Sequence, residues 1–136
     1  MEKLKERIKL HEGLRLEPYL CPAGHWTIGF GHRCESTHPP IHLHEAEALL
    51  ESDIHHASEQ VMTLPLVGKL NQVRRGVLVE LAFWMGFNGL LKFRRMLTAL
   101  RRGSFQRAAL ELYNSELGDK YPQRAGELAV LMWEGK

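Results

Sequence analysis

Apolar residues recur every three or four positions along most of this 136-residue chain, which is the spacing of amphipathic helices. In residues 2–12 they alternate with Lys and Glu, so a short helix is predicted there, ended by Gly13. From about residue 43 to residue 63 the same spacing predicts a helix long enough to connect two lobes, and Pro65 ends it. The apolar positions of this second helix are Ala46, Leu49, Leu50, Ile54, Ala57 and Val61.

The second half of the chain is also rich in helical patterns. Residues 73–85 are so apolar that they predict a helix buried on most sides, which Gly86, Asn88 and Gly89 interrupt. The further helices predicted in this half cover about residues 93–101, 105–112 and 123–132, with breaks at Gly103 and across residues 118–122. This half is therefore expected to be entirely helical.

Between the first two helices the pattern changes. Gly24, Gly29 and Gly31 separate short runs of aromatic and β-branched residues, which predicts a small antiparallel hairpin or three-stranded sheet. Pro39 and Pro40 then predict a loop, because two prolines continue neither a helix nor a strand ladder.

Together these patterns predict an α+β fold that is mainly helical. By length, residues 1–136 form a single domain. We expect an N-lobe with a small β-hairpin at about residues 12–42, a connecting helix at about 43–63, and an all-helical C-lobe at about 66–136 that also includes helix 2–12.

Composition narrows the class of protein. The apolar fraction of 44% and the charged fraction of 25% are ordinary for a soluble globular domain. No apolar run approaches the roughly 20 residues that span a bilayer, and residues 1–10 lack the apolar segment of a signal peptide. We therefore expect no stable membrane insertion and no secretion signal. A chain of this length also needs no disulfide framework, so Cys21 and Cys34 are expected to be thiols of a reducing cytoplasm.

Charge is divided unevenly along the chain. Residues 1–65 hold six Lys and Arg against ten Asp and Glu, a balance of −4, whereas residues 66–136 hold twelve against six, a balance of +6. A basic half favours a polyanionic partner such as cell wall, lipopolysaccharide or nucleic acid. A nucleic-acid-binding alternative would use the paired arginines, which are Arg74, Arg75, Arg94, Arg95, Arg101 and Arg102.

Three polar residues stand around the predicted hairpin. Eight residues separate Glu12 from Cys21, and five separate Cys21 from Thr27. Hydrolysis of a glycosidic bond needs a carboxyl group that protonates the leaving oxygen and a second group that positions or activates water. An acid at a helix end followed by a hairpin with two more polar groups can supply both.

The stretch from His11 to His32 resembles the catalytic signature of phage-type lysozymes (the T-even phage lysozyme family, glycoside hydrolase family 24). That signature is Glu, eight residues, Asp or Cys, five residues, Thr, and it closes with Thr-Ile-Gly-x-Gly-His, as residues 27–32 do here. The resemblance continues in the helical half and covers nearly the whole chain. It is carried there by Arg74-Arg75-Gly76-Val77-Leu78, Phe83-Trp84-Met85-Gly86, Phe93, Ser104-Phe105, Ala108-Ala109, Pro122 and Arg124-Ala125.

The resemblance implies a lysozyme-like fold and assigns roles to individual residues. Glu12 would be the general acid, while Cys21 and Thr27 would position the water. Gly31, like the other hairpin glycines, would let the backbone approach a sugar. Arg124 would pair with Glu12, although a cation beside that carboxyl favours its ionised form and opposes proton donation.

Two further assignments follow from the same resemblance, and the histidines are judged by their spacing. Phe83 would line the substrate side of the helical lobe, and His32 and Asp53 would form a structural ion pair between hairpin and connecting helix. Five histidines, at positions 38, 42, 44, 55 and 56, lack the spacing of a zinc site, so a solvated surface is expected rather than a metal. The segment between His32 and the connecting helix is short for the family.

The presence of cysteine at the Asp position leaves several roles for Cys21 open. A thiol has a pKa near ~8.5, so Cys21 could orient water weakly, act as a thiolate base if a cation helps, or form a covalent thioglycoside. Oxidation with Cys34, in the same small lobe, would remove Cys21 from catalysis.

The leading functional prediction is a muramidase. It would hydrolyse the β-1,4 linkage between N-acetylmuramic acid and N-acetylglucosamine in peptidoglycan, with inversion, for host lysis by a phage or prophage. We expect a monomer without a cofactor or a nucleic-acid partner, made in the host cytoplasm and released by a holin to act in the periplasm. The alternatives are a catalytically weak peptidoglycan-binding module, a virion entry enzyme and an antibacterial effector.

Overall fold

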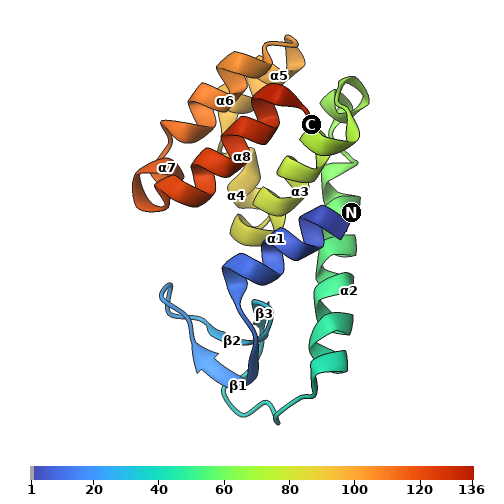
Figure 1. Cartoon of the computed structure of the whole chain (residues 1–136), viewed down its shortest axis with the longest axis vertical. Helices are drawn as coiled ribbons and strands as arrows, with labels where there is room; N and C mark the ends of the chain where they lie inside the picture. The colour runs from blue at the N-terminus through green and yellow to red at the C-terminus, as the bar shows by residue number, and fades with distance from the viewer. Residues whose placement is uncertain (1) are drawn as a thin grey trace. The chain divides into compact units, whose positions relative to one another are not determined.

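The computed structural model describes residues 2–136 and shows a mainly helical α+β fold, which confirms the predicted class (Figure 1). The elements of its first part are α1 (Glu2–Glu12), β1 (Arg15–Leu20), β2 (Trp26–Gly29), β3 (His32–Arg33) and α2 (Leu43–Val61). A short 3-10 helix, η1 (Pro65–Lys69), follows, and then α3 (Gln72–Met85), α4 (Phe87–Leu91), α5 (Arg94–Arg101), α6 (Phe105–Tyr113), α7 (Glu116–Lys120) and α8 (Pro122–Glu134).

The chain divides into two compact units, Met1–His56 and Ala57–Lys136. The boundary lies inside α2, and α1 belongs to the first unit, whereas the sequence grouped residues 2–12 with the C-terminal helices. The lobe boundaries themselves stay a prediction. No helix within the described part of the chain is both long enough and apolar enough to span a membrane.

In unit 1 the three strands form an antiparallel sheet in the order β1-β2-β3. Tyr19 stands opposite Thr27, Thr27 stands opposite Arg33, and the β1–β2 ladder is irregular between Arg15 and Tyr19. Because directly opposed residues of antiparallel strands point to the same face, this register places Tyr19 and Thr27 side by side.

Ion pairs join α1 to α2 within unit 1. The Lys5 Nζ lies 3.3 Å from Glu51 Oε2, and the Lys9 Nζ lies 3.2 Å from Glu47 Oε1. Such partly exposed pairs each contribute about 0–1 kcal/mol, so burial of the apolar face of α1 at Ile8 matters more. The result is a fixed position for the C-terminal end of α1, where Glu12 lies.

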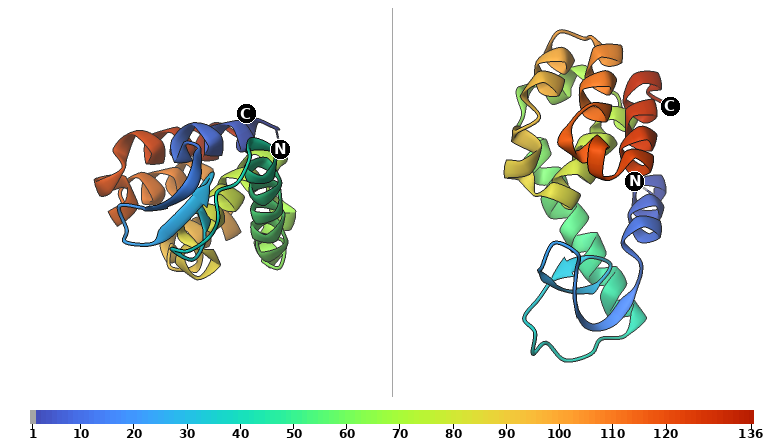
Figure 2. Two further views of the ribbon diagram at one scale, coloured as in Figure 1. Left: turned by 90° about the horizontal axis from the view of Figure 1, so that it is seen from below. Right: turned by 90° about the vertical axis from the view of Figure 1, so that its left-hand side faces the viewer.

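In unit 2 the helices pack around a core of buried leucines and methionines, and α6 lies between α5 and α8 (Figure 2, right). The Asn71 side chain caps α3 by accepting a 3.0 Å hydrogen bond from the Arg74 backbone N–H. Arg74 in turn donates to the Met132 and Trp133 carbonyl oxygens at the end of α8, at 2.7 and 2.6 Å. These bonds satisfy carbonyl groups that have no partner within a helix.

Three predicted boundaries differ from the structure. α2 ends at Val61, and Pro65 begins η1 rather than ending α2. The glycine-containing segment after α3 forms the short helix α4, and residues 116–120 form α7 instead of a break. α7 exists because the Ser115 side chain caps it, accepting from the Gly118 N–H at 3.3 Å.

Gly118 and Gly76 give a matched test of this packing. A Cβ at Gly118 would collide with the carbonyl oxygen of Tyr113, whereas a Cβ at Gly76, inside α3, would have no neighbour within 4 Å. Gly118→Ala should therefore lower the free energy of unfolding by about 1–3 kcal/mol. Gly76→Ala should raise it by about 0.5–1 kcal/mol, because alanine is the better helix former. Urea denaturation measures both, and a Gly118→Ala variant as stable as wild type would contradict the packing described.

Candidate active site

Glu12 is the last residue of α1, and its carboxyl lies against the backbone of Gly31. A Cβ built on Gly31 would stand 2.5 Å from the Glu12 Oε1 and 3.0 Å from its Cδ, and Gly31 has a φ of +80°. Both the close approach and the left-handed backbone require glycine here. In the structure the missing side chain of Gly31 makes room for the Glu12 carboxyl, and the predicted approach of a sugar to Gly31 stays a prediction.

Cys21 lies at the start of the tight loop between β1 and β2. Its backbone N–H donates to the His25 carbonyl at 2.9 Å, and its sulfur accepts from the His25 N–H at 3.4 Å. Thr27 is buried, and its hydroxyl donates to the same His25 carbonyl at 3.0 Å. The loop therefore fixes the thiol and the hydroxyl through one shared residue, His25.

The surroundings of Cys21 change its acidity. Burial raises the pKa of the Cys21 thiol, but hydrogen bonding lowers it by more, first from the His25 backbone and then from Ala23, Thr27 and Gly24. The net pKa of Cys21 lies below its ordinary value, so more thiolate is present near neutral pH than for a free thiol. The sequence pointed to a nearby cation as the source of such an effect, whereas in the structure hydrogen bonds lower the pKa of Cys21.

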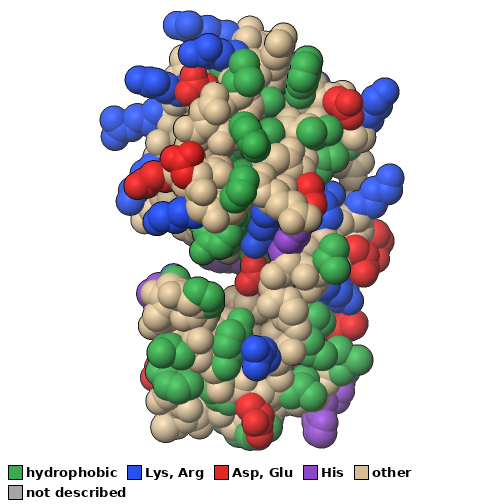
Figure 3. All heavy atoms as spheres, turned by 60° about the vertical axis from the view of Figure 1, so that its left-hand side comes forward, with side chains coloured by type: hydrophobic (Ala, Val, Ile, Leu, Met, Phe, Trp, Pro, Cys, Tyr) green, Lys and Arg blue, Asp and Glu red, His purple; other side chains and the backbone are tan. Residues whose placement is uncertain are grey.

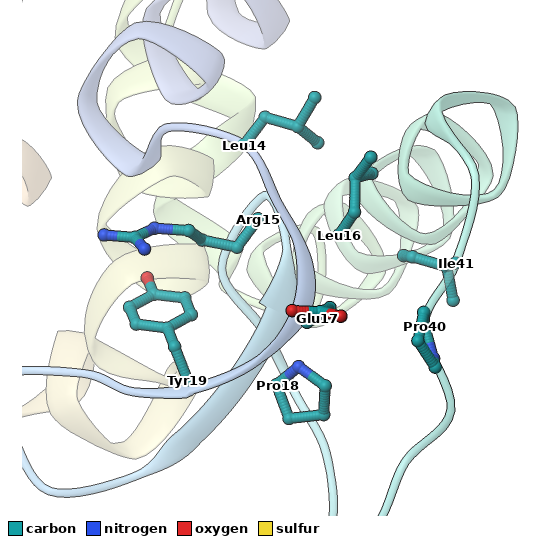
Figure 4. Close-up of a pocket in the computed structure, with 8 residues that line it drawn as sticks. All are labelled: Leu14, Arg15, Leu16, Glu17, Pro18, Tyr19, Pro40 and Ile41. Carbon is teal, nitrogen blue, oxygen red and sulfur yellow. The ribbon is translucent and has the colours of Figure 1, made fainter.

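Tyr19 belongs to the same group of side chains and was missed from the sequence. It faces Thr27 across the sheet, and its pKa is raised first by burial and then by the charges of Glu12 and Cys21. The Arg15 guanidinium lies 4.8 Å from the centre of the Tyr19 ring and opposes that rise, and Figure 4 shows the two side by side. The sequence did contain a signal for Tyr19: it lies two residues before Cys21, and residues two apart in a strand share a face.

Register also separates the two cysteines. The Cys34 N–H donates to the Trp26 carbonyl at 3.1 Å, next to the pair formed by Thr27 and Arg33. Alternation then places Cys34 on the face opposite to Thr27 and Cys21. Both cysteines are free, and joining them would require a strand to change face.

An open pocket of about 520 Å³ lies beside β1 in unit 1 (Figure 4). It is lined by Leu14, Arg15, Leu16, Glu17, Pro18, Tyr19, Pro40 and Ile41. Tyr19 lines this pocket and also interacts electrostatically with Glu12 and Cys21. The pocket is therefore adjacent to the candidate catalytic residues but does not contain them.

The structure brings His32 and Asp53 together, with Nδ1 and Oδ2 2.8 Å apart and both side chains about one-third exposed. The contact joins β3 to α2 inside unit 1. Its contribution to stability, as opposed to its presence, stays a prediction.

In unit 2, Arg124 is buried rather than exposed on the helix surface. Its Nε lies 3.6 Å from Oε2 of the fully buried Glu80, and its guanidinium stacks 3.8 Å above the Trp84 ring. Glu80 was not among the residues predicted from the sequence, although a carboxylate inside an apolar helix signals a buried cation. Phe83 is only partly buried in α3, and its predicted role and the predicted pairing of Arg124 with Glu12 stay predictions.

No group of three His, Cys, Asp or Glu side chains capable of holding a metal occurs between residues 2 and 136. The histidines at positions 42 and 44 instead stack on one another, with ring centres 5.7 Å apart.

The mainly helical α+β fold is that of a lysozyme-like protein, and comparison with known proteins gives its class. The phage lysozyme family profile matches residues 9–125, and the chain belongs to that family. It is therefore a glycosidase that acts on peptidoglycan.

Relatives extend over most of the chain. Probable T4-type lysozyme 1 of Dictyostelium discoideum is 25% identical over 163 aligned residues, covering 99% of this chain and 96% of its own. An endolysin of Acyrthosiphon pisum secondary endosymbiont phage 1 is 34% identical over 109 residues, covering 76% and 70%. The pre-baseplate central spike protein Gp5 of Enterobacteria phage T4 is 30% identical over 132 residues, covering 77% of this chain and 23% of the spike protein.

Gly31→Ala tests the contact between Glu12 and Gly31. The new Cβ should displace the Glu12 carboxyl, and misplacement of a catalytic group by about 1 Å can cost roughly 10²-fold in rate. Gly103→Ala is the matched control, since Gly103 lies outside the candidate site and has a φ of +72° but no neighbour within 4 Å of an added Cβ. Both variants should lose about 1–2 kcal/mol of stability from the left-handed backbone, but only Gly31→Ala should lose activity. Equal activity in the two variants would contradict the proposed constraint.

The thiols of Cys21 and Cys34 should lose their protons at different pH values. Burial and the charge of Glu35 raise the pKa of Cys34, whereas the pKa of Cys21 is lowered, so Cys21 should become a thiolate at lower pH than Cys34. Iodoacetamide alkylation followed against pH measures this in Cys34→Ser, which retains Cys21, and in Cys21→Ser, which retains Cys34. The alkylation midpoint of Cys21 should lie below that of Cys34. Coincident midpoints, or the reverse order, would rule out the loop's effect on the thiol.

Proposed function

We propose that this chain is a muramidase that hydrolyses the β-1,4 linkage between N-acetylmuramic acid and N-acetylglucosamine in peptidoglycan, with Glu12 as general acid. The observation that carries the proposal is the Glu12 carboxyl held against Gly31, beside a loop that presents Cys21 and Thr27. Protonated Glu12 gives its proton to the leaving glycosidic oxygen as the bond to the anomeric carbon breaks.

Cys21 and Thr27 position the attacking water on the opposite face of the sugar. The water oxygen bonds to the anomeric carbon, and its proton passes to the Cys21 thiolate, which becomes a thiol. The lowered pKa of Cys21 supports this use of a thiolate in place of a carboxylate. Attack from the face opposite to the leaving group gives inversion, and exchange with solvent restores both protonation states.

Arg124 and Phe83 complete the proposed site from the helical unit. Arg124 pairs with Glu12 and holds its orientation, while Phe83 lines the substrate side of α3. Burial and stacking already restrict the Arg124 guanidinium, which supports a positioning role rather than a mobile surface charge. His32 and Asp53 act as a structural pair.

The biological role we propose is host lysis at the end of a phage or prophage cycle. The endolysin names among the relatives support it. In that role the protein is a monomer that collects in the host cytoplasm and reaches the periplasmic wall after a holin opens the membrane. Similarity to a phage spike protein supports a second candidate, in which the same chemistry serves virion entry.

Glu12→Gln separates a catalyst from a binding module. It keeps the size of the side chain but removes the proton donor, so reducing-end release from purified peptidoglycan should fall by about 10²–10⁴-fold. Binding to the same peptidoglycan, measured by co-sedimentation, should persist. Release of reducing ends by Glu12→Gln at the wild-type rate would exclude Glu12 as the acid.

The Cys21 series then tests the second group and the outcome at the anomeric carbon. Cys21→Asp should keep activity because it restores an anionic base, whereas Cys21→Ala should lose most of it. NMR of the first product anomer should show inversion. An active Cys21→Ala variant would remove the thiol from the mechanism while leaving the role of Glu12 intact.

A further inference from the structure

One face of α5 is made of arginine. Met96, Leu97, Ala99 and Leu100 are buried, while Arg94, Arg95, Arg101 and Arg102 at the ends of the helix are exposed. Arg94 and Arg101 are seven residues apart, as are Arg95 and Arg102, which is two helical turns or about 10 Å along the axis. The four guanidinium groups therefore project from one side of α5, and Lys92 precedes them.

Within residues 2–136, no carboxylate forms an ion pair with these four arginines or with Lys92. Residues 81–110 contain six Lys and Arg and no Asp or Glu. Of these six, Arg107 is paired, with Glu111 at 2.9 Å, and the other five make no ion pair with any residue between 2 and 136. The elements packed against α5 do not neutralise its positive charge. The Glu111 carboxylate of α6 is paired with Arg107 of the same helix. η1 adds a further cation, Lys69, whose Nζ donates to the Arg101 carbonyl at 2.7 Å.

Such a surface does not serve folding. Like charges on one helix face destabilise it, and exposed arginines without partners add no compensating contact. Arg74 and Arg75 differ from the arginines of α5, because their guanidinium groups donate hydrogen bonds to backbone carbonyl oxygens. Arg75 donates to the Val67 carbonyl at 3.1 Å. Of the six arginines that suggested nucleic-acid binding, two therefore have a structural role, and the four of α5 are exposed without an ion pair among the described residues. Figure 3 shows Lys and Arg side chains gathered along the edge of unit 2.

We propose that the α5 cationic face, formed by Lys92, Arg94, Arg95, Arg101 and Arg102, docks this protein on the phosphate headgroups of an anionic membrane. Guanidinium groups bind phosphate oxygens in a bidentate manner, and basic residues near an anionic bilayer each contribute about 1 kcal/mol. The apolar side of α5 is buried in the core, so the helix docks by charge and does not insert.

The composition of this face favours a membrane over nucleic acid. α5 carries no aromatic side chain on which a base could stack, and its four arginines are exposed. Docking would hold a peptidoglycan hydrolase at the membrane that underlies the wall and raise its local concentration there. The inference is independent of the roles proposed for Glu12 and Cys21.

The test compares two variants that lose equal charge. Arg94→Gln/Arg95→Gln/Arg102→Gln removes three charges from the α5 cationic face, and Lys3→Gln/Lys120→Gln/Lys136→Gln removes three from exposed positions elsewhere. Wild type should co-sediment with vesicles of equal parts phosphatidylglycerol and phosphatidylcholine, but not with phosphatidylcholine alone. The arginine variant should bind the anionic vesicles about 10- to 100-fold more weakly, and the lysine variant by less than about threefold. Raising the NaCl concentration should release wild type.

Several results would overturn the proposal. Equal weakening in both variants would mean that net charge alone attracts the protein. Binding to duplex DNA but not to anionic vesicles at the same salt concentration would show that the α5 cationic face binds nucleic acid instead of a membrane. Thermal unfolding and release of reducing ends from purified peptidoglycan, which contains no lipid, should be unchanged in both variants and so establish that both are folded.

Discussion

The structure of the candidate site depends on one steric constraint, the contact between the Glu12 carboxyl and the backbone of Gly31. Glu12 ends α1, and Gly31 lies in the turn between β2 and β3, so this close approach joins the helix to the hairpin. Any side chain at position 31 would occupy the space of the carboxyl. The loop holding Cys21 and the strand holding Thr27 belong to the same hairpin, so their positions relative to Glu12 follow from that contact.

The replacement of an acidic residue by cysteine is consistent with the electrostatics around position 21. Hydrogen bonds from the short loop outweigh burial and favour the thiolate, which gives Cys21 part of the character of a carboxylate. The pKa of Tyr19 is raised by burial and then by the charges of Glu12 and Cys21, which disfavour its ionised form. A phenol that stays protonated remains a hydrogen-bond donor beside the two groups that exchange protons.

The sequence predicted most of the fold and part of the candidate site. Long apolar periodicity gave α2, α3 and α8 to within a few residues, because burial of one face dictates that spacing. It failed at α4 and α7, which are five residues long and depend on contacts such as the Ser115 cap rather than on periodicity. Spacing singled out Glu12, Cys21 and Thr27, but Tyr19 and Glu80 emerged only from strand register and burial, which a linear pattern does not show.

Glu80 also bears on the conflict between an arginine and a proton donor. A guanidinium group beside Glu12 would favour the carboxylate and oppose donation to the glycosidic oxygen. Arg124 is not an isolated cation, however, because the fully buried Glu80 lies 3.6 Å from its Nε and shares its charge. The Trp84 ring, 3.8 Å away, stabilises the guanidinium further by a cation–π contact. An arginine paired in this way adds less positive potential to its surroundings than a free guanidinium group, so the positioning role proposed for Arg124 opposes acid catalysis less than an isolated cation would.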